Sequence, residues 1–219
     1  MTSAPLSQTA EDYLKEVYKL QVEQGRATTS ALAERVGVSA PSATAMLKKL
    51  AALGLVQHEP YRGVRLTSAG EKAAVEVIRH HRLLEQYLSE TLGLPIDEVH
   101  AEADRLEHVL SEELEARIDE SLGYPTHDPH GDPIPDANLE LPRGAGRSLA
   151  DLHEGESATV RRVPDADTGL LRYLSDLGLV PGEDVELVRA EPFGGPLTVL
   201  AGGGEHAVAR ELAARIGVS

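Results

Sequence analysis

The sequence predicts a mainly α-helical protein with a small β domain at its C-terminal end. Apolar residues recur every three or four positions through most of residues 11–122, which is the spacing of amphipathic helices. Five prolines then fall within residues 123–146, and the remaining residues carry short apolar runs separated by glycines, as strands do. We therefore expect three domains, with bounds at 1–70, 71–142 and 143–219.

The charged residues are unevenly distributed along the chain. Its 36 acidic and 21 basic residues give a net charge of −15. Residues 1–70 hold eight basic and six acidic residues, a balance of +2, whereas residues 71–140 hold five basic and eighteen acidic residues, a balance of −13. Six of the nine histidines lie in the middle third. Carboxylates with imidazoles are ligands of divalent metals, and the overall acidity argues against a wholly basic nucleic-acid coat protein.

The absence of cysteine excludes disulfide scaffolds, thiolate zinc sites, iron–sulfur clusters and thiol nucleophiles. The first residues lack a basic stretch followed by an apolar core, and no stretch of the sequence approaches the roughly 18 apolar residues of a membrane span. We expect a cytoplasmic protein with no membrane partner.

The first domain begins with three predicted helices. Their apolar positions fall in three groups, which are Tyr13 to Leu20, Leu32 to Val36 and Met46 to Leu53. Thr28 or Thr29 can cap the second helix, and Ser39 or Ser42 the third. Gly37 forms a tight break between these two helices, so together they predict a helix-turn-helix.

A β-hairpin follows the third helix in the predicted order. Two short runs, Leu55 to His58 and Val64 to Thr67, are separated by a turn that contains Pro60 and Gly63. A hairpin directly after the second helix of a helix-turn-helix is a wing. The first domain is therefore predicted to be a winged helix-turn-helix.

Short polar side chains and cations lie where a winged helix meets DNA. Hydroxyls at the start of the third helix suit base edges, apolar groups suit thymine methyls, and basic residues neutralise phosphates. The candidate DNA-binding residues are Arg26, Ser39, Pro41, Ser42, Thr44, Lys48, Lys49, Arg62 and Arg65. The alternative is that the basic residues form a solvated face and the domain binds protein.

Acidic residues and histidines recur at helical spacing in the middle domain. Predicted helices run from Ala69 to Leu92 and from about Ile96 to Leu122. Residues three or four apart share a helix face, and such pairs link six side chains, which are His81, Glu85, His100, Asp104, Glu107 and His108. Oxygen and imidazole donors without thiolate favour Mn(II) or Fe(II).

The alternative for this region is a set of exposed ion pairs, which a chain with 26% charged residues contains in any case. The other histidines are assigned to the surface, namely His58, His80, His127, His130, His153 and His206. Neither HExxH nor a nucleophile elbow is present, so a hydrolytic zinc enzyme lacks its motif. We expect no enzymatic activity.

The C-terminal domain predicts short strands and one short helix. The strands are expected at Ala158 to Val163, Val185 to Arg189 and Leu197 to Ala201, with a helix at Gly169 to Leu177 and a strand running into a helix within Ala207 to Ile216. Several short strands in about 70 residues suggest a small barrel.

The motifs together resemble the diphtheria toxin repressor family of iron- and manganese-dependent transcriptional regulators. The resemblance covers nearly the whole chain through TAEDYLKEVYKL, LAERVGVSAPSATAMLKKLAALGLV, RGVRLTSAGEKAA, RHHRLLEQYLSETLG, VHAEADRLEHVLSEELEARI and HGDPIP. It implies an N-terminal winged helix-turn-helix, a helical metal-binding and dimerisation domain, and a C-terminal SH3-like (FeoA-like) β-barrel.

The resemblance also implies two metal sites. The primary site would comprise Asp12, Asp104, Glu107 and His108. The ancillary site would comprise His81, Glu85 and His100, completed by an oxygen ligand of the C-terminal domain, Asp167 or alternatively Asp165. Methionine and cysteine typically replace Asp12 and Asp104 in the iron-responsive branch, so Mn(II) is the expected metal and Fe(II) the alternative. Lys15 stands where manganese-type members often carry a further carboxylate, which argues against a binuclear primary site.

The implied function is metal-dependent regulation of transcription, acting as a repressor of genes for metal uptake and homeostasis. The expected partners are a pseudo-palindromic operator in double-stranded DNA and a second copy of the chain, contacted through Val109, Leu110 and Leu114. The alternative function is a winged-helix regulator that senses a small ligand other than a metal.

Overall fold

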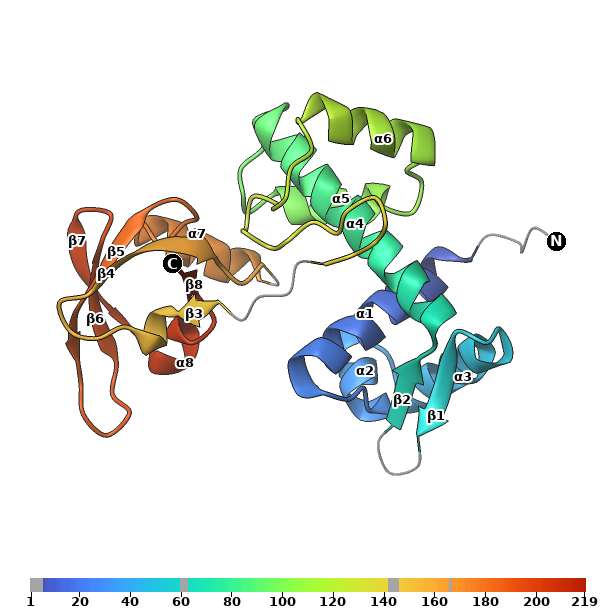
Figure 1. The fold of residues 1–219 in the computed structure, drawn as a ribbon. Helices are drawn as coiled ribbons and strands as arrows, with labels where there is room; N and C mark the ends of the chain where they lie inside the picture. The colour runs from blue at the N-terminus through green and yellow to red at the C-terminus, as the bar shows by residue number, and fades with distance from the viewer. Residues whose placement is uncertain (1–5, 60–62, 142–145, 166) are drawn as a thin grey trace. The chain divides into compact units, whose positions relative to one another are not determined.

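The computed structural model describes residues 6–59, 63–141, 146–165 and 167–219, and most of its helices precede a C-terminal sheet (Figure 1). The chain divides into two compact units, which are described separately. The first comprises residues 1–80, 107–110 and 135–140, and the second comprises residues 81–106, 111–134 and 141–219. The predicted fold class, mainly α with a small β domain, is confirmed.

The first unit contains the winged helix-turn-helix. Its elements are α1 (Gln8–Gln24), α2 (Thr29–Val36), α3 (Ala40–Ala52), the antiparallel strands β1 (Val56–Glu59) and β2 (Gly63–Leu66), and the start of α4 (Ser68–Glu90). Of the alternative caps, Thr28 accepts the Ala31 N–H and Ser39 accepts the Ser42 N–H. Gly37 ends α2 at φ +71°, a conformation that costs glycine little.

The wing is held against the loop before α2. The Val64 N–H donates to the Ala27 carbonyl at 2.9 Å, and a Cβ on Gly63 would lie only 2.2 Å from the same oxygen. Glycine is therefore required where the wing approaches this backbone. The core beneath is aliphatic apart from Tyr13, with Leu14, Leu20, Leu32, Leu47 and Leu50 among its buried residues.

The long helix predicted from about Ile96 to Leu122 is wrong as a single element. The structure has two helices there, α5 (Val99–Leu106) and α6 (Glu112–Ser121). The Ser111 hydroxyl accepts the Leu114 N–H, which gives α6 its own N-terminal cap. Glu107 and His108 consequently lie in the turn after α5 rather than on its helical face.

The Pro-rich stretch at residues 123–146 contains an ordered tight turn. The Asp128 N–H donates to the Asp132 carbonyl at 3.0 Å, and His127 pairs with Pro133 in an isolated bridge. Gly131 has a φ of +86°, and a Cβ there would lie 1.8 Å from the carbonyl oxygen of Arg161. The Val163 N–H donates to the His130 carbonyl at 2.9 Å. Backbone contacts thus join this turn to the C-terminal domain within the second unit.

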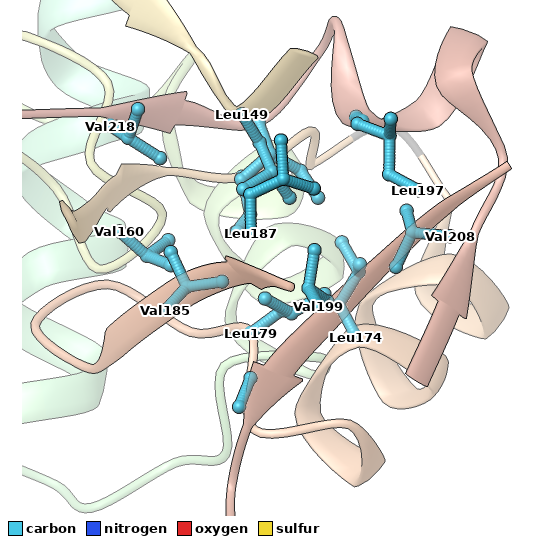
Figure 2. Close-up of a cluster of buried hydrophobic side chains, with 14 of the residues drawn as sticks. Leu149, Val160, Leu174, Leu179, Val185, Leu187, Leu197, Val199, Val208 and Val218 are labelled. Carbon is cyan, nitrogen blue, oxygen red and sulfur yellow. The ribbon is translucent and has the colours of Figure 1, made fainter. Parts of the chain in front are cut away.

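The C-terminal domain is an antiparallel sheet with strand order β3-β8-β4-β5-β6-β7. The strands are β3 (Arg147–Ser148), β4 (Ser157–Arg162), β5 (Asp184–Ala190), β6 (Leu197–Ala201), β7 (Gly204–Val208) and β8 (Gly217–Val218). The helical segments are a 3-10 turn (Leu149–Asp151), α7 (Thr168–Asp176) and α8 (Arg210–Ala213). Their leucines and valines form one core (Figure 2). No helix among the described residues is long and apolar enough to cross a membrane.

Candidate metal centres and DNA-binding face

The first cluster of ligands, here called the Asp12 cluster, comprises Asp12, Glu107 and His108. Asp12 lies on α1, whereas Glu107 and His108 lie in the turn after α5. Their ligand atoms lie within 4.8 Å of one another. His108 Nε2 is 2.9 Å from Asp12 Oδ1 and 3.3 Å from Glu107 Oε1. Two carboxylates and an imidazole therefore converge from segments about 95 residues apart in the sequence.

The two ring nitrogens of His108 face different carboxylates. Nδ1 is 2.7 Å from Glu11 Oε2, on the side away from Asp12. A hydrogen bond from one ring nitrogen to a carboxylate leaves the lone pair on the other, as in metal-bound histidines. Glu11 is thus placed to direct His108 Nε2 towards Asp12 and Glu107. The sequence reasoning missed Glu11 because only structure relates it to His108.

A lysine also reaches into the Asp12 cluster. Lys15 Nζ lies 2.6 Å from Glu107 Oε1, and both side chains are buried. The backbone carbonyl of Glu107 is 3.1 Å from His80 Nδ1. The segment that carries Glu107 is therefore held by both α1 and α4. His80, assigned to the surface, is half-buried.

The second cluster, here called the His81 cluster, comprises His81, Glu85, His100 and Asp104. Glu85 Oε1 lies 2.9 Å from both His81 Nε2 and His100 Nδ1. Asp104 is predicted in the primary site, but its carboxylate faces these histidines, with Oδ1 3.3 Å from His81 Nδ1 and Oδ2 3.7 Å from His100 Nε2. The cluster ranges from fully buried Glu85 to Asp104, whose side chain is 47% exposed. Burial alone raises the pKa of Glu85, but the neighbouring His81, His100 and His130 side chains lower it well below its usual range.

The structure separates the two candidate C-terminal ligands. Asp165 offers an oxygen within 4.8 Å of the ligand atoms of Glu85 and His100. Asp167 instead caps α7, where its Oδ1 accepts the Leu170 N–H at 2.9 Å. Asp165 is therefore the residue that lies beside the His81 cluster, and Asp167 is the N-terminal cap of α7.

The prediction that His130 lies at the surface is wrong. His130 is completely buried, and its Nε2 lies 2.9 Å from the Ile96 carbonyl. Asp128 is buried beside it and has a pKa raised well above its usual range by burial and by the Glu85 charge. Both lie in the Pro-rich turn, where no helical periodicity marks the buried positions. His58, His127 and His153 are exposed as predicted, and His206 is half-buried.

The candidate DNA-binding residues lie on the exposed side of the winged helix. In α3, Ala43, Leu47 and Leu50 are buried, so the opposite face is open to solvent. The described candidates are all exposed, namely Arg26, Ser39, Pro41, Ser42, Thr44, Lys48, Lys49 and Arg65. Arg62 lies outside the described residues.

Comparison with known protein families accounts for nearly the whole chain. The profile of the iron dependent repressor, N-terminal DNA binding domain, matches residues 5–64. The profile of the iron dependent repressor, metal binding and dimerisation domain, matches residues 67–136, and that of the FeoA domain matches residues 147–219.

Individual relatives match over similar lengths. The iron-dependent repressor IdeR of Mycobacterium leprae is 35% identical over 210 residues, which is 90% of each chain. The diphtheria toxin repressor of Corynebacterium efficiens is 35% identical over 196 residues, or 85% of each chain. A solved manganese-dependent transcriptional repressor in complex with manganese has 41% identity and a TM-score of 0.85, covering 95% of this chain and 98% of that one. ScaR with bound Zn²⁺ has 34% identity and a TM-score of 0.81, covering 96% and 98%. The chain therefore belongs to the iron-dependent repressor family, the family of the diphtheria toxin repressor, whose members are metal-dependent transcriptional repressors and not enzymes.

Proposed function

We propose that this protein is a repressor that binds operator DNA when Mn(II) fills the Asp12 and His81 clusters, with Fe(II) as the alternative activating metal. The observation that carries the proposal is the Asp12 cluster. It joins α1, which is part of the winged helix, to the turn after α5 through three side chains with ligand chemistry. A bound divalent ion supplies attraction to both segments at once and so holds them together.

The donor set favours manganese or iron over softer metals. Asp12, Glu107 and His108 offer oxygen and imidazole nitrogen, and the chain has no cysteine to offer a thiolate. Hard oxygen donors suit Mn(II), while imidazole suits Fe(II) as well. The solved manganese-dependent repressor and the iron-dependent repressor IdeR are both similar to this chain, which supports either metal.

We assign the His81 cluster an ancillary role, completed by Asp165. Glu85 Oε1 sits between two imidazoles, and Asp165 belongs to the C-terminal domain. Occupation of this cluster links the metal-binding helices to the C-terminal domain. We propose Asp104 as a further ligand of this cluster, since its carboxylate faces His81 and His100.

The repressor is proposed to act as a homodimer on a pseudo-palindromic operator. Val109 and Leu114 are 67% and 50% exposed, which is unusual for large apolar residues and fits a surface covered by a second copy. Two copies of α3 then enter successive major grooves. The proposed domain bounds remain 1–70, 71–142 and 143–219, and the proposed location is the cytoplasm.

A selection experiment tests the function and identifies the operator sequence at the same time. Full-length protein is used to select binders from a random double-stranded DNA library, with Mn(II) in one arm and a chelator in the other. We expect a palindromic sequence to be enriched only with Mn(II). Equal enrichment of one sequence in both arms contradicts metal control, and enrichment of none contradicts sequence-specific repression.

A further inference from the structure

Buried acidic and imidazole groups beside Glu85 are not used by the two clusters described above. Glu85, Asp128 and His130 offer three ligand atoms within 4.8 Å of one another. Their side chains are 0%, 1% and 0% exposed. We propose that Glu85 Oε2, Asp128 Oδ2 and His130 Nδ1 form a third, enclosed site for a first-row divalent metal ion, here called the Asp128 site.

The same three atoms are buried without a hydrogen-bond partner among the described residues. Glu85 Oε2, Asp128 Oδ2 and His130 Nδ1 each lack a donor, although nearly all buried polar atoms in folded proteins have a partner. The His130 Nδ1 to Glu85 Oε2 distance is 3.7 Å, which is longer than a hydrogen bond. Three buried acceptor atoms that face one another without a donor are costly to bury, and a cation between them would compensate this cost.

The tautomer of His130 leaves the lone pair of Nδ1 directed into the Asp128 site. Its Nε2 lies 2.9 Å from the Ile96 carbonyl oxygen, which can only accept, so Nε2 carries the proton. Nδ1 of the neutral ring is then an acceptor facing Glu85. Metal-bound histidines commonly donate their second ring N–H to a backbone carbonyl in this manner.

The turn that carries Asp128 orients its carboxylate in the same way. Asp128 Oδ1 accepts the backbone N–H groups of His130 and Asp132, each at 2.9 Å. This leaves Oδ2 as the carboxylate oxygen without a hydrogen bond. The turn is tight enough to require Gly131, which approaches the Arg161 backbone. Hydrogen bonds that fix a ligand from behind are a regular feature of metal sites.

Glu85 links the Asp128 site to the His81 cluster. Its Oε1 faces His81 and His100, whereas its Oε2 faces His130. One carboxylate therefore offers one oxygen to each site. The role of Glu85 in both sites rests on the proposed function. The rest of the inference does not, because Asp128 and His130 belong to neither the Asp12 cluster nor the His81 cluster. Two carboxylates and a neutral imidazole carry a charge of −2, which a divalent ion cancels, and the oxygen and nitrogen donors suit Mn(II), Fe(II) or Zn(II).

The alternative to a metal ion in the Asp128 site is a proton on His130. Burial alone lowers the pKa of His130, but the Glu85 and Asp128 carboxylates raise it to about 9. Arg82 also approaches, with Nε 3.8 Å from Asp128 Oδ2, and it is shared with Asp132. A protonated His130 beside Arg82 would offset the carboxylates without a metal ion. Metal content separates the two occupants.

The first test counts metal ions. Full-length protein is saturated with Mn(II), separated from unbound ion by gel filtration, and assayed for manganese per chain. We expect Asp128→Asn to bind about one ion fewer than the wild type. The matched control is Asp132→Asn, a neighbouring buried carboxylate that pairs with Arg162 at 2.9 Å and belongs to none of the ligand groups. Equal counts in Asp128→Asn and the wild type overturn the proposal, as does equal loss in the control.

The second test uses the wild type alone, so it does not depend on how a variant folds. Crystals grown with Mn(II) are measured on the short-wavelength side of the manganese absorption edge. We expect an anomalous peak among Glu85, Asp128 and His130. Peaks at the Asp12 and His81 clusters without one here overturn this inference and leave the proposed function standing. A peak here in a protein that binds its operator equally without metal supports the site and contradicts the proposed function instead.

Discussion

Lys15 Nζ lies 2.6 Å from Glu107 Oε1, and the two side chains are 8% and 0% exposed. Lys15 stands on α1 three residues after Asp12, so a fixed positive charge projects into the cluster that is proposed to bind metal. A buried carboxylate needs a compensating charge, and here the ammonium supplies one. A metal ion that binds Glu107 must therefore either displace the Lys15 ammonium group or bind Glu107 beside it.

Replacement of Lys15 tests this competition. Lys15→Met leaves Glu107 without the ammonium, and loss of one partner of a buried pair costs about 3–5 kcal/mol. We expect a lower melting temperature without metal and a larger rise on addition of Mn(II) than in the wild type, measured by calorimetry. The control is Lys19→Met, because Lys19 is more exposed and pairs with Glu16 at 3.8 Å. A manganese-induced rise equal to that of the wild type would show that Lys15 does not compete.

The neighbouring carboxylates of α1 are predicted to have different roles. Asp12→Asn removes a ligand facing His108 Nε2, so Mn(II)-dependent DNA binding should be lost. Glu11→Ala removes only the partner of His108 Nδ1, and such changes typically weaken metal affinity about 10–100-fold. Manganese titrations followed by fluorescence anisotropy of labelled operator measure both. The reverse ranking would exchange the roles of Glu11 and Asp12.

Asp165 and Asp167 should also respond differently to substitution. Asp165→Asn removes an oxygen beside Glu85 and His100, so we expect weaker binding of one manganese ion with little change in stability. Asp167→Ala removes the cap of α7, which typically costs about 1 kcal/mol, and should leave metal binding unchanged. Calorimetric titration and thermal unfolding of both variants give the two readouts. Loss of metal only in Asp167→Ala would assign the ligand to that residue.

The exposed face of α3 predicts how DNA binding depends on salt. Lys48→Ala and Lys49→Ala each remove one cation that can contact phosphate, and each should reduce the slope of log affinity against log salt by about 1. Arg117→Ala is the control, because Arg117 is an exposed cation of α6 paired with Glu113. Unchanged slopes in both lysine variants would place DNA elsewhere on the winged helix.

One ion pair of the C-terminal domain predicts a pH dependence of stability. A hydrogen bond from Arg147 and one from the His153 N–H lower the pKa of Glu156 to about 2 from its usual 4.5. Because the pKa is lower in the folded state, the interactions of the ionised Glu156 stabilise the fold fully above pH 4.5. This contribution disappears as the pH falls towards 2. Glu156→Gln should therefore lower the melting temperature at about pH 7 and less so at about pH 3. Because the pair is exposed, salt should shrink the difference. Glu183→Gln, an exposed change in the same domain, should show no such dependence.

Periodic segments of the sequence predicted the fold well, and irregular segments did not. The helices α1 to α4, the wing and the strands β4, β5 and β6 follow apolar spacing that a single sequence displays. The strands β3 and β8 were not predicted, because each has only two residues and shows no period. The break between α5 and α6 depends on the Ser111 cap, which a continuous helical pattern hides. Asp128 and His130 lie among prolines, where no period distinguishes buried from exposed positions, so their burial emerges only from tertiary contacts. The pairing of Glu11 and Lys15 with residues more than 90 positions away is likewise invisible to local spacing.

Metal control of DNA binding is tested most directly by the affinity of the full-length protein for its selected operator. Fluorescence anisotropy gives this affinity in saturating Mn(II) and in chelator at the same ionic strength. We predict that chelation weakens binding at least about tenfold, or ~1.4 kcal/mol, and that Asp12→Asn binds weakly in both conditions. Equal affinity of the wild type with Mn(II) and with chelator would contradict the proposal that metal switches the repressor on.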